Sequence, residues 1–309
     1  MPRWLLVLMI VLIVIFGVGL GAARYYLGRE AVPEKSDYVL DLTEIRRLAS
    51  SLPGPAPIAV NHEQVAEASV PEGAVFAGRS LRTPHPMTHG AYQVVYPDGF
   101  LMIDSAFDAD ALHVMNPGVG FSTSAWDAIQ RGLAEAKKIV ITHEHPDHIG
   151  GIARFKDPEK LVGRLVLNKE QLGNGPALSL AKFPESLAKS VTPIEYERYY
   201  ALAPGVVLIR APGHTPGSQL VYVRLESGQE LLFIGDVAWH MDQLRELWYR
   251  PRLVTDLFIG ENRAQVLSEF RTLHDLAERE PAVLIVVSHD VDERKDLIAR
   301  GVLGDHFKF

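Results

Sequence analysis

The chain contains no cysteine among its 309 residues. This absence excludes disulfides, cysteine-ligated zinc, iron–sulfur clusters and a thiol nucleophile, and it removes the usual indicator of redox compartment. An excess of basic charge is also missing, because 38 acidic residues outnumber 31 basic ones and the net charge is −7. A phosphate backbone is bound by clustered lysine and arginine. We therefore expect no nucleic-acid partner.

The first residues contain one long stretch without charge. Trp4 to Ala23 are all apolar or glycine, and such a run spans about 30 Å as a helix, the thickness of a bilayer's hydrocarbon core. Trp4 at one end and Tyr25 and Tyr26 at the other are typical of membrane interfaces. A cleaved signal peptide is the alternative, with a small-residue cleavage site at 21–23, but its apolar region is usually only about 7–15 residues long.

The length of the run favours an uncleaved anchor. We predict an anchor over residues 1–28, with the membrane span at about 4–23, a polar tether over 29–37, and one domain over 38–309. A three-residue head that carries Arg3 stays more easily in the cytoplasm. The protein is thus expected to be a single-pass membrane protein with its large C-terminal domain on the extracytoplasmic side.

The domain alternates blocks of strands with helices. Two β-rich runs flank a Pro-Asp-Gly turn and predict a hairpin, and further strands and helices follow. The predicted strands are 92–96, 100–103, 139–142, 206–209, 219–225, 230–234 and 283–287, and the predicted helices are 44–50, 122–136, 262–278 and one from 292. This order indicates an α/β fold with two sheets covered by helices, a four-layer sandwich around one core.

Residues 142–151 hold the most informative motif. His143, His145, Asp147 and His148 occur within six positions, directly after a predicted buried strand. Side chains at i and i+2 of an extended stretch point the same way, so His143 and His145 can bind one ion. Pro146 then turns the chain, which lets Asp147 and His148 face a second ion. Imidazole and carboxylate ligands suit Zn, Fe or Mn.

Three further segments place a candidate ligand at or just beyond a predicted strand. They contain His214 in Pro-Gly-His-Thr-Pro-Gly-Ser, Asp236 in Ile-Gly-Asp, and His289 in Val-Ser-His-Asp. Sheets fix the loops that carry functional groups, so the location favours a site. Glu144 alternates away from its neighbours and is expected to face solvent or to support the ligands.

These four blocks, in this order, resemble the metallo-β-lactamase-fold hydrolases from about Gly90 onwards. The resemblance implies an αβ/βα sandwich with two metal ions at the edge where the sheets meet. It implies one ion held by His143, His145 and His214, a second held by Asp147, His148 and His289, and Asp236 as the bridge between them. Asp104 resembles a supporting residue of the family. Zn2+ is the expected metal, with Fe or Mn as alternatives.

The resemblance also implies a reaction. Two close cations lower the pKa of a shared water from about 15.7 towards 7, and the resulting bridging hydroxide can attack a carbonyl substrate such as an ester, lactone or thioester. Asp147 is the predicted catalytic residue, which orients the nucleophile and carries its proton. The chain is therefore expected to be a binuclear metal-dependent hydrolase of small molecules.

Among branches of the family, the acyl-homoserine-lactonase-like enzymes look most similar. They carry a tyrosine three residues after the bridging aspartate, where this chain has Trp239. Trp239, expected to pack against an acyl chain, and His240 are the candidate substrate-pocket residues. A β-lactamase or phosphodiesterase of the same fold remains an alternative, as does a non-catalytic metal-binding or partner-binding protein. Substrate identity and oligomeric state are not determined by the sequence.

Overall fold

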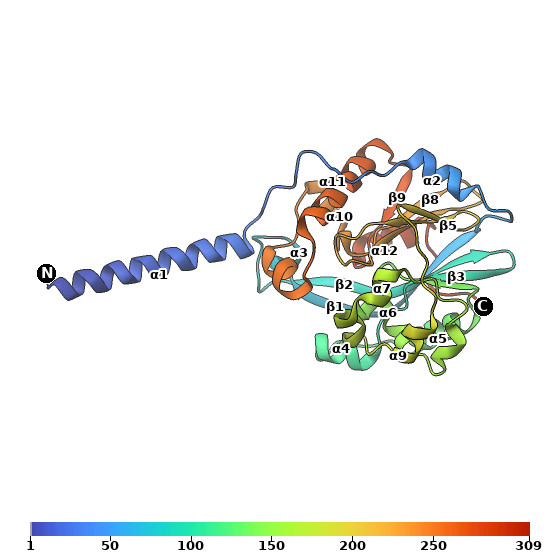
Figure 1. The fold of residues 1–309 in the computed structure, drawn as a ribbon, viewed down its shortest axis with the longest axis horizontal. Coiled ribbons are helices and arrows are strands. Elements are labelled where there is room, and N and C mark those ends of the chain that lie inside the picture. The colour runs from blue at the N-terminus through green and yellow to red at the C-terminus, as the bar shows by residue number, and fades with distance from the viewer. Residues whose placement is uncertain (1) are drawn as a thin grey trace.

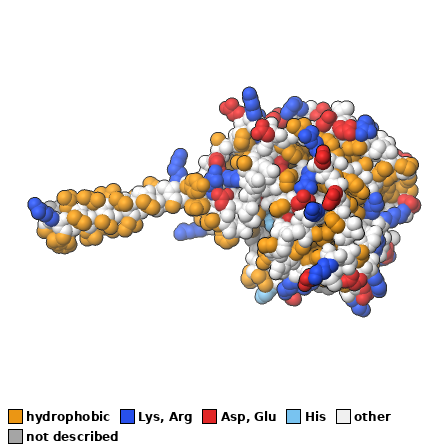
Figure 2. Space-filling model, in the orientation of Figure 1, with side chains coloured by type: hydrophobic (Ala, Val, Ile, Leu, Met, Phe, Trp, Pro, Cys, Tyr) orange, Lys and Arg blue, Asp and Glu red, His pale blue; other side chains and the backbone are white. Residues whose placement is uncertain are grey.

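A computed structural model describes residues 2–309 of the chain, and its most prominent feature is a projecting N-terminal helix (Figure 1). Helix α1 (Arg3–Leu27) buries none of its residues, and an 18-residue window has a mean hydropathy of 3.0. Figure 2 shows hydrophobic side chains along its length. Its length and composition make it a candidate membrane span, although a signal sequence has the same properties.

The rest of the chain contains two sheets. Strands β1–β4 form the first sheet in chain order and β5–β9 form the second, and only the last pair of each sheet, β3–β4 and β8–β9, is parallel. The strands are β1 (Ala59–Pro71), β2 (Pro84–Tyr96), β3 (Gly99–Ile103), β4 (Lys138–Val140), β5 (Tyr199–Ala203), β6 (Val206–Arg210), β7 (Gln219–Arg224), β8 (Glu230–Phe233) and β9 (Val283–Val286).

Helices cover the outer faces of both sheets, and three apolar clusters fill the spaces between the layers. The middle cluster joins the sheets, with Val94 and Ile103 from one and Val221 and Phe233 from the other. The predicted four-layer αβ/βα sandwich is confirmed. The helices are α2 (Leu42–Ala49), α3 (Glu72–Val75), α4 (Ala109–Met115), α5 (Thr123–Glu135), α6 (Pro146–Ala153), η1 (Pro158–Leu161), α7 (Lys169–Gly173), α8 (Gly175–Leu180), α9 (Glu185–Ser190), η2 (Gly235–Val237), α10 (Met241–Glu246), η3 (Leu253–Ile259), α11 (Arg263–Arg279) and α12 (Val291–Ala299).

Side-chain caps begin two of the predicted helices. The Asp41 carboxylate accepts a hydrogen bond from the Glu44 amide and begins α2, and Ser122 does the same for α5 through the Ala125 amide. Such caps satisfy amide groups that have no partner within the helix. The sequence did not predict the 13-residue strand β1 or the short helices α7–α9.

Residues 29–37 lie against the domain, although their polar composition suggested a tether. Glu30 pairs with Arg252 and Arg263 at 2.7 and 2.8 Å, and the Ser36 hydroxyl donates to the Ser268 carbonyl at 2.6 Å. The start of the domain is therefore held by α11 and by the residue that precedes η3.

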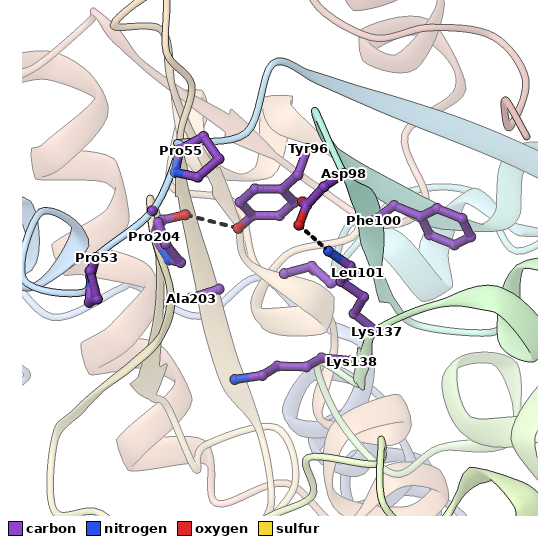
Figure 3. Close-up of a pocket in the computed structure, with 11 residues that line it drawn as sticks. Pro53, Pro55, Tyr96, Asp98, Phe100, Leu101, Lys137, Lys138, Ala203 and Pro204 are labelled. Carbon is purple, nitrogen blue, oxygen red and sulfur yellow. Dashed lines mark hydrogen bonds and ion pairs between the residues drawn. The ribbon is translucent and has the colours of Figure 1, made fainter.

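A pocket lies at the turn between β2 and β3 (Figure 3). Here the Tyr96 hydroxyl donates to the Pro204 carbonyl at 2.9 Å, and Lys137 pairs with Asp98. Asp98 and Lys137 are paired with each other and largely exposed, and the Lys138 ammonium donates to the Leu202 carbonyl at 2.6 Å. We therefore assign this pocket no chemical role.

Candidate metal centre

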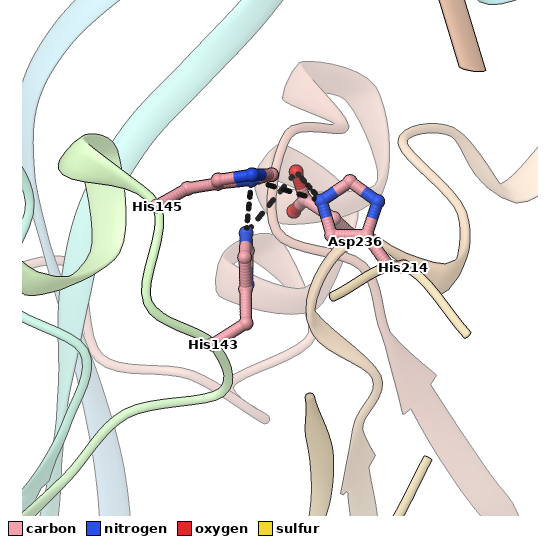
Figure 4. A group of neighbouring side chains, drawn as sticks. All are labelled: His143, His145, His214 and Asp236. Carbon is pink, nitrogen blue, oxygen red and sulfur yellow. Dashed lines mark hydrogen bonds and ion pairs between the residues drawn. The ribbon is translucent and has the colours of Figure 1, made fainter. Parts of the chain in front are cut away.

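The first group of candidate ligands brings His143 and His145, from the loop between β4 and α6, together with His214 and Asp236 (Figure 4). The Nδ1 atom of His145 lies 3.0 Å from His143 Nε2 and 3.1 Å from His214 Nε2. Asp236 Oδ2 lies 3.8 Å from His143 Nε2 and 3.6 Å from His214 Nε2. Ligand atoms around one tetrahedral zinc, with bonds of about 2.0–2.1 Å, lie roughly 3.3 Å apart. These four side chains therefore have the spacing of a metal site.

A second group meets at the other oxygen of Asp236. Asp236 Oδ1 lies 3.1 Å from His289 Nε2 and 3.4 Å from His148 Nε2. Asp147 Oδ2 lies 3.5 Å from His289 Nε2 and 3.6 Å from His148 Nε2. All seven residues singled out from the sequence are thus neighbours, and Asp236 is placed to be shared between the two groups.

The donor atoms fit divalent cations. His148 Nε2 and Asp236 Oδ1 are buried and have no hydrogen-bond partner, a situation that is costly unless a bound ion or water satisfies them. Burial lowers the pKa of His145 to about 4 and holds the pKa of His143 well below its ordinary value. Both imidazoles are therefore neutral near pH 7, which is the form that binds a metal.

Opposite electrostatic effects act on the second group. Burial alone would raise the pKa of Asp147, but the facing imidazoles of His148, His89 and His289 together hold that pKa well below its ordinary value. Burial would lower the pKa of His148, but the carboxylates of Asp147, Asp104 and Asp236 raise it well above its ordinary value. Protons and cations therefore compete for this group, and acid favours the proton.

The remaining ring nitrogens of three candidate ligands are hydrogen-bonded on the side away from the group. His148 Nδ1 donates to Asp104 Oδ2 at 2.9 Å, and His289 Nδ1 donates to the Thr88 carbonyl at 2.9 Å. His214 Nδ1 donates to Glu261 Oε1 at 2.7 Å. Such contacts fix the tautomer and leave Nε2 free to bind an ion.

Asp104 supports the motif loop, as the resemblance implied. Besides His148, its carboxylate accepts the Thr142 amide at 2.6 Å, and its backbone is left-handed with φ of +62°. This conformation is uncommon for a residue other than glycine and is retained where surrounding contacts impose it.

The alternative of a solvent-facing Glu144 is wrong, because its side chain is fully buried. Its carboxylate accepts the Thr215 hydroxyl at 2.8 Å and the Asn174 amide at 2.7 Å. Glu144 therefore joins the loop of His143 and His145 to the loop of His214. The sequence showed its alternation but not the partners that bury it.

Trp239 and His240 occupy different positions relative to the ligands. Trp239 Nε1 donates to Asp236 Oδ2 at 2.8 Å, so its indole N–H is directed at the shared carboxylate. His240 begins α10, where its Nδ1 accepts the Asp242 amide at 3.1 Å, and its ring packs against those of His85 and Phe76. Trp239 thus belongs to the edge of the centre, and His240 lies outside both ligand groups.

Three residues at the centre, Arg250, Glu261 and His89, were not found from the sequence. Arg250 is fully buried, and its Nη2 donates to Glu261 Oε1 at 2.6 Å and to the Asp236 carbonyl at 2.8 Å. His89 on β2 places Nδ1 3.5 Å from Asp147 Oδ2, and with Asp147 and His289 it forms a further group of possible metal ligands. None of the three lies in a recognisable motif, so only their proximity in the fold reveals them.

Comparison with known proteins agrees with this geometry. A family model described as the Metallo-beta-lactamase superfamily matches residues 87–289. A probable metallo-hydrolase of Mycobacterium tuberculosis is 28% identical over 231 residues, which cover 63% of this chain and 72% of that protein. An N-acyl homoserine lactonase of Bacillus thuringiensis is 24% identical over 161 residues, which cover 51% of this chain and 57% of the lactonase.

Solved structures share the fold. An N-acyl homoserine lactone hydrolase with N-hexanoyl-L-homoserine bound at its catalytic metal centre has a TM-score of 0.60 at 14% identity, with 78% of this chain and 96% of that chain covered. The dizinc quorum-quenching lactonase AidC has a TM-score of 0.55 at 14% identity, with 77% and 91% covered. Since the matched family region also contains all seven candidate ligands, from His143 to His289, the chain belongs to the metallo-β-lactamase superfamily.

Proposed function

We propose that this protein is a membrane-anchored, binuclear metal-dependent hydrolase of small carbonyl substrates, with esters and lactones, including acyl lactones, as the first class to test. The observation that carries this proposal is the sharing of Asp236 between two adjacent groups of candidate ligands, most of which are buried. A pair of divalent ions, most simply Zn2+, supplies an acidified water as nucleophile and a Lewis acid for the carbonyl oxygen.

The residues of the chain divide the remaining tasks. Asp147 is 14% exposed while Asp236 is 5% exposed, so Asp147 is the more accessible carboxylate of the pair. We assign it the role of orienting the attacking water and passing a proton to the leaving oxygen. Trp239 and Arg250 donate hydrogen bonds to Asp236, and Glu261 accepts one from His214. These contacts hold the two ligands in position.

An apolar cleft beside the ligand loop supports a substrate with a hydrocarbon part. The cleft has a volume of about 360 Å³ and adjoins Pro146 and Gly150 of α6. Its apolar lining includes Phe107, Val114, Met115 and Leu180. Phe107 also packs on the ring of His89, so the cleft begins next to the second ligand group. The N-acyl homoserine lactonases among the relatives agree with a substrate of this kind.

The position in the membrane is a separate part of the proposal. Helix α1 is apolar and buries none of its side chains against the domain, so a bilayer is its simplest partner. We propose the extracytoplasmic side for the domain, and protease treatment of intact cells tests that side. Extraction of membranes with alkaline carbonate and the mass of the mature N-terminus test retention and cleavage of this helix.

The experiment for the enzymatic part uses the full chain in detergent. Bound metal is counted, and an acyl-homoserine lactone, an aryl ester, a thioester, a β-lactam and a phosphodiester are offered as substrates. We expect two ions per chain and turnover of the lactone or ester. Asp236→Asn should lower turnover by several orders of magnitude, whereas His113→Ala, outside the ligand groups on α4, should leave it unchanged.

Each other outcome rejects a stated part of the proposal. Turnover of only the β-lactam or the phosphodiester would reject the ester and lactone assignment. One ion or none at saturating zinc would reject the binuclear centre. Two ions without turnover of any substrate would favour a non-catalytic metal-binding protein.

A further inference from the structure

The C-terminal end of α1 is fastened to the domain by side chains of residues far along the chain. The Arg252 guanidinium carbon lies 4.9 Å from the centre of the Tyr25 ring. Glu30 accepts hydrogen bonds from Arg252 and Arg263, and the Arg29 guanidinium lies 4.3 Å from the Trp248 ring. These contacts begin at the last turn of α1, so they fix the direction in which the helix leaves the domain.

Two apolar side chains are exposed next to this junction. Leu257 is 62% exposed and Phe258 is 78% exposed, near the end of the π-helical segment η3 that starts one residue after Arg252. In Figure 1 this segment is the orange coil beside the C-terminal end of α1. Adjacent exposed leucine and phenylalanine side chains are unfavourable in water, and they typically mark a contact surface.

We propose that Leu257 and Phe258 form a second membrane contact, inserted into the interface of the same leaflet from which the C-terminal end of α1 emerges. The inference rests on the proposed anchoring by α1. If α1 spans the bilayer, Tyr25 lies at the interface, and its contact with Arg252 brings the start of η3 to the same level. Phe258 follows Arg252 by six positions, a rise of at most about 9 Å along a helix, which is comparable with the depth of the interface.

The basic side chains at the junction also suit a bilayer surface. Arg24 and Arg29 lie at the end of α1 and form no ion pair among residues 2–309, whereas Arg252 is paired with Glu30 and Asp256. Unpaired arginines that flank a membrane span are attracted to anionic lipid headgroups.

This second contact would set the orientation of the domain. Arg250, two residues before Arg252, donates to the Asp236 carbonyl and lies over the Trp239 ring at 4.4 Å. The segment that touches the bilayer is therefore continuous with one that supports the metal centre. The contact would hold this end of the domain close to the membrane, where amphiphilic acyl substrates accumulate.

The absence of cysteine allows a site-specific test in the full chain. Phe258→Cys, Phe309→Cys and Ile13→Cys are each labelled with the environment-sensitive dye NBD and reconstituted into vesicles of phosphatidylcholine and phosphatidylglycerol. Phe309 is a matched control, because it is 48% exposed at the C-terminus, which lies on the side of the domain away from α1 (Figure 1). Lipids with a nitroxide quencher near the headgroup or deep in the acyl chain report depth.

We expect the label at position 258 to shift its emission to the blue and to be quenched by the shallow nitroxide, at least about twofold more than the label at 309. The label at 13 should be quenched by the deep nitroxide. Labels at 258 and 309 that behave alike, with the label at 13 quenched, would overturn the second contact alone. An unquenched label at 13 would overturn the anchor itself. A blue shift at 258 that appears in detergent and grows with protein concentration would assign the surface to self-association instead.

Discussion

The substitution Glu261→Gln tests whether the buried residues behind His214 control both folding and metal binding. The Glu261 carboxylate accepts hydrogen bonds from His214 Nδ1 at 2.7 Å, Arg250 Nη2 at 2.6 Å and the Tyr249 hydroxyl at 3.1 Å. Burial would raise the pKa of Glu261, but Arg250 and His214 hold it below its ordinary value. The residue is therefore ionised at neutral pH, and glutamine removes its charge with little change in volume.

The expected loss of stability follows from the burial of Arg250. Both side chains of the pair are fully buried, and removal of one partner from such a pair costs about 3–5 kcal/mol in free energy of unfolding. The Arg250 guanidinium also lies 4.4 Å from the Trp239 ring and 4.6 Å from the Tyr249 ring. These cation–π contacts retain part of its stabilisation, so we expect a loss near the lower end, about 3 kcal/mol.

Metal affinity should fall by a separate mechanism. His214 Nδ1 loses a charged acceptor, and loss of such a support typically weakens metal binding by about 10–100-fold. Denaturant unfolding of the metal-free full chain measures the loss of stability, and zinc titration against a chromophoric chelator measures the loss of metal affinity. The double variant Arg250→Met/Glu261→Gln removes both buried charges, so it should recover much of the stability while its metal affinity stays low.

The double variant makes the reasoning refutable. If Glu261→Gln unfolds like the wild type, the pair does not stabilise the fold in the way that its burial implies. If the double variant regains wild-type zinc affinity, the loss in the single variant came from misfolding, and the contact between Glu261 and His214 has no role in metal binding.

Three further changes give distinct results. Burial raises the pKa of Glu269 to about 8. The folded chain therefore binds this proton more tightly than the unfolded chain, and stability falls as pH rises from about 4.5 to 8. Glu269→Gln should remove this fall, as measured by Tm at pH 5 and 8.5. Trp239→Phe deletes the donor to Asp236. It should raise the activation free energy that kcat/KM reports by about 1–3 kcal/mol, equally for long-chain and short-chain lactones. A loss confined to the long-chain lactone would indicate that Trp239 packs against substrate. His89→Ala should weaken binding of the second ion about tenfold in a zinc titration, and an unchanged affinity would remove His89 from the set of possible ligands.

Much of the candidate centre was readable because its information is local in the chain. His143, His145, Asp147 and His148 lie within six positions after a strand, and their directions follow from the geometry of an extended segment and a proline turn. The apolar run of α1 and the caps of α2 and α5 are local in the same sense. The two-sheet sandwich followed from the order of strands and helices.

The tertiary structure alone decided which distant residues surround that motif. Glu261 lies 47 residues after His214 and His89 lies on another strand, yet both contact candidate ligands. Glu144 is buried by partners from two other segments, and residues 29–37 are held by side chains more than 200 positions away. Covalent geometry fixes the spacing of neighbours along a chain, but contacts across the fold depend on how whole layers pack, and no local pattern records them.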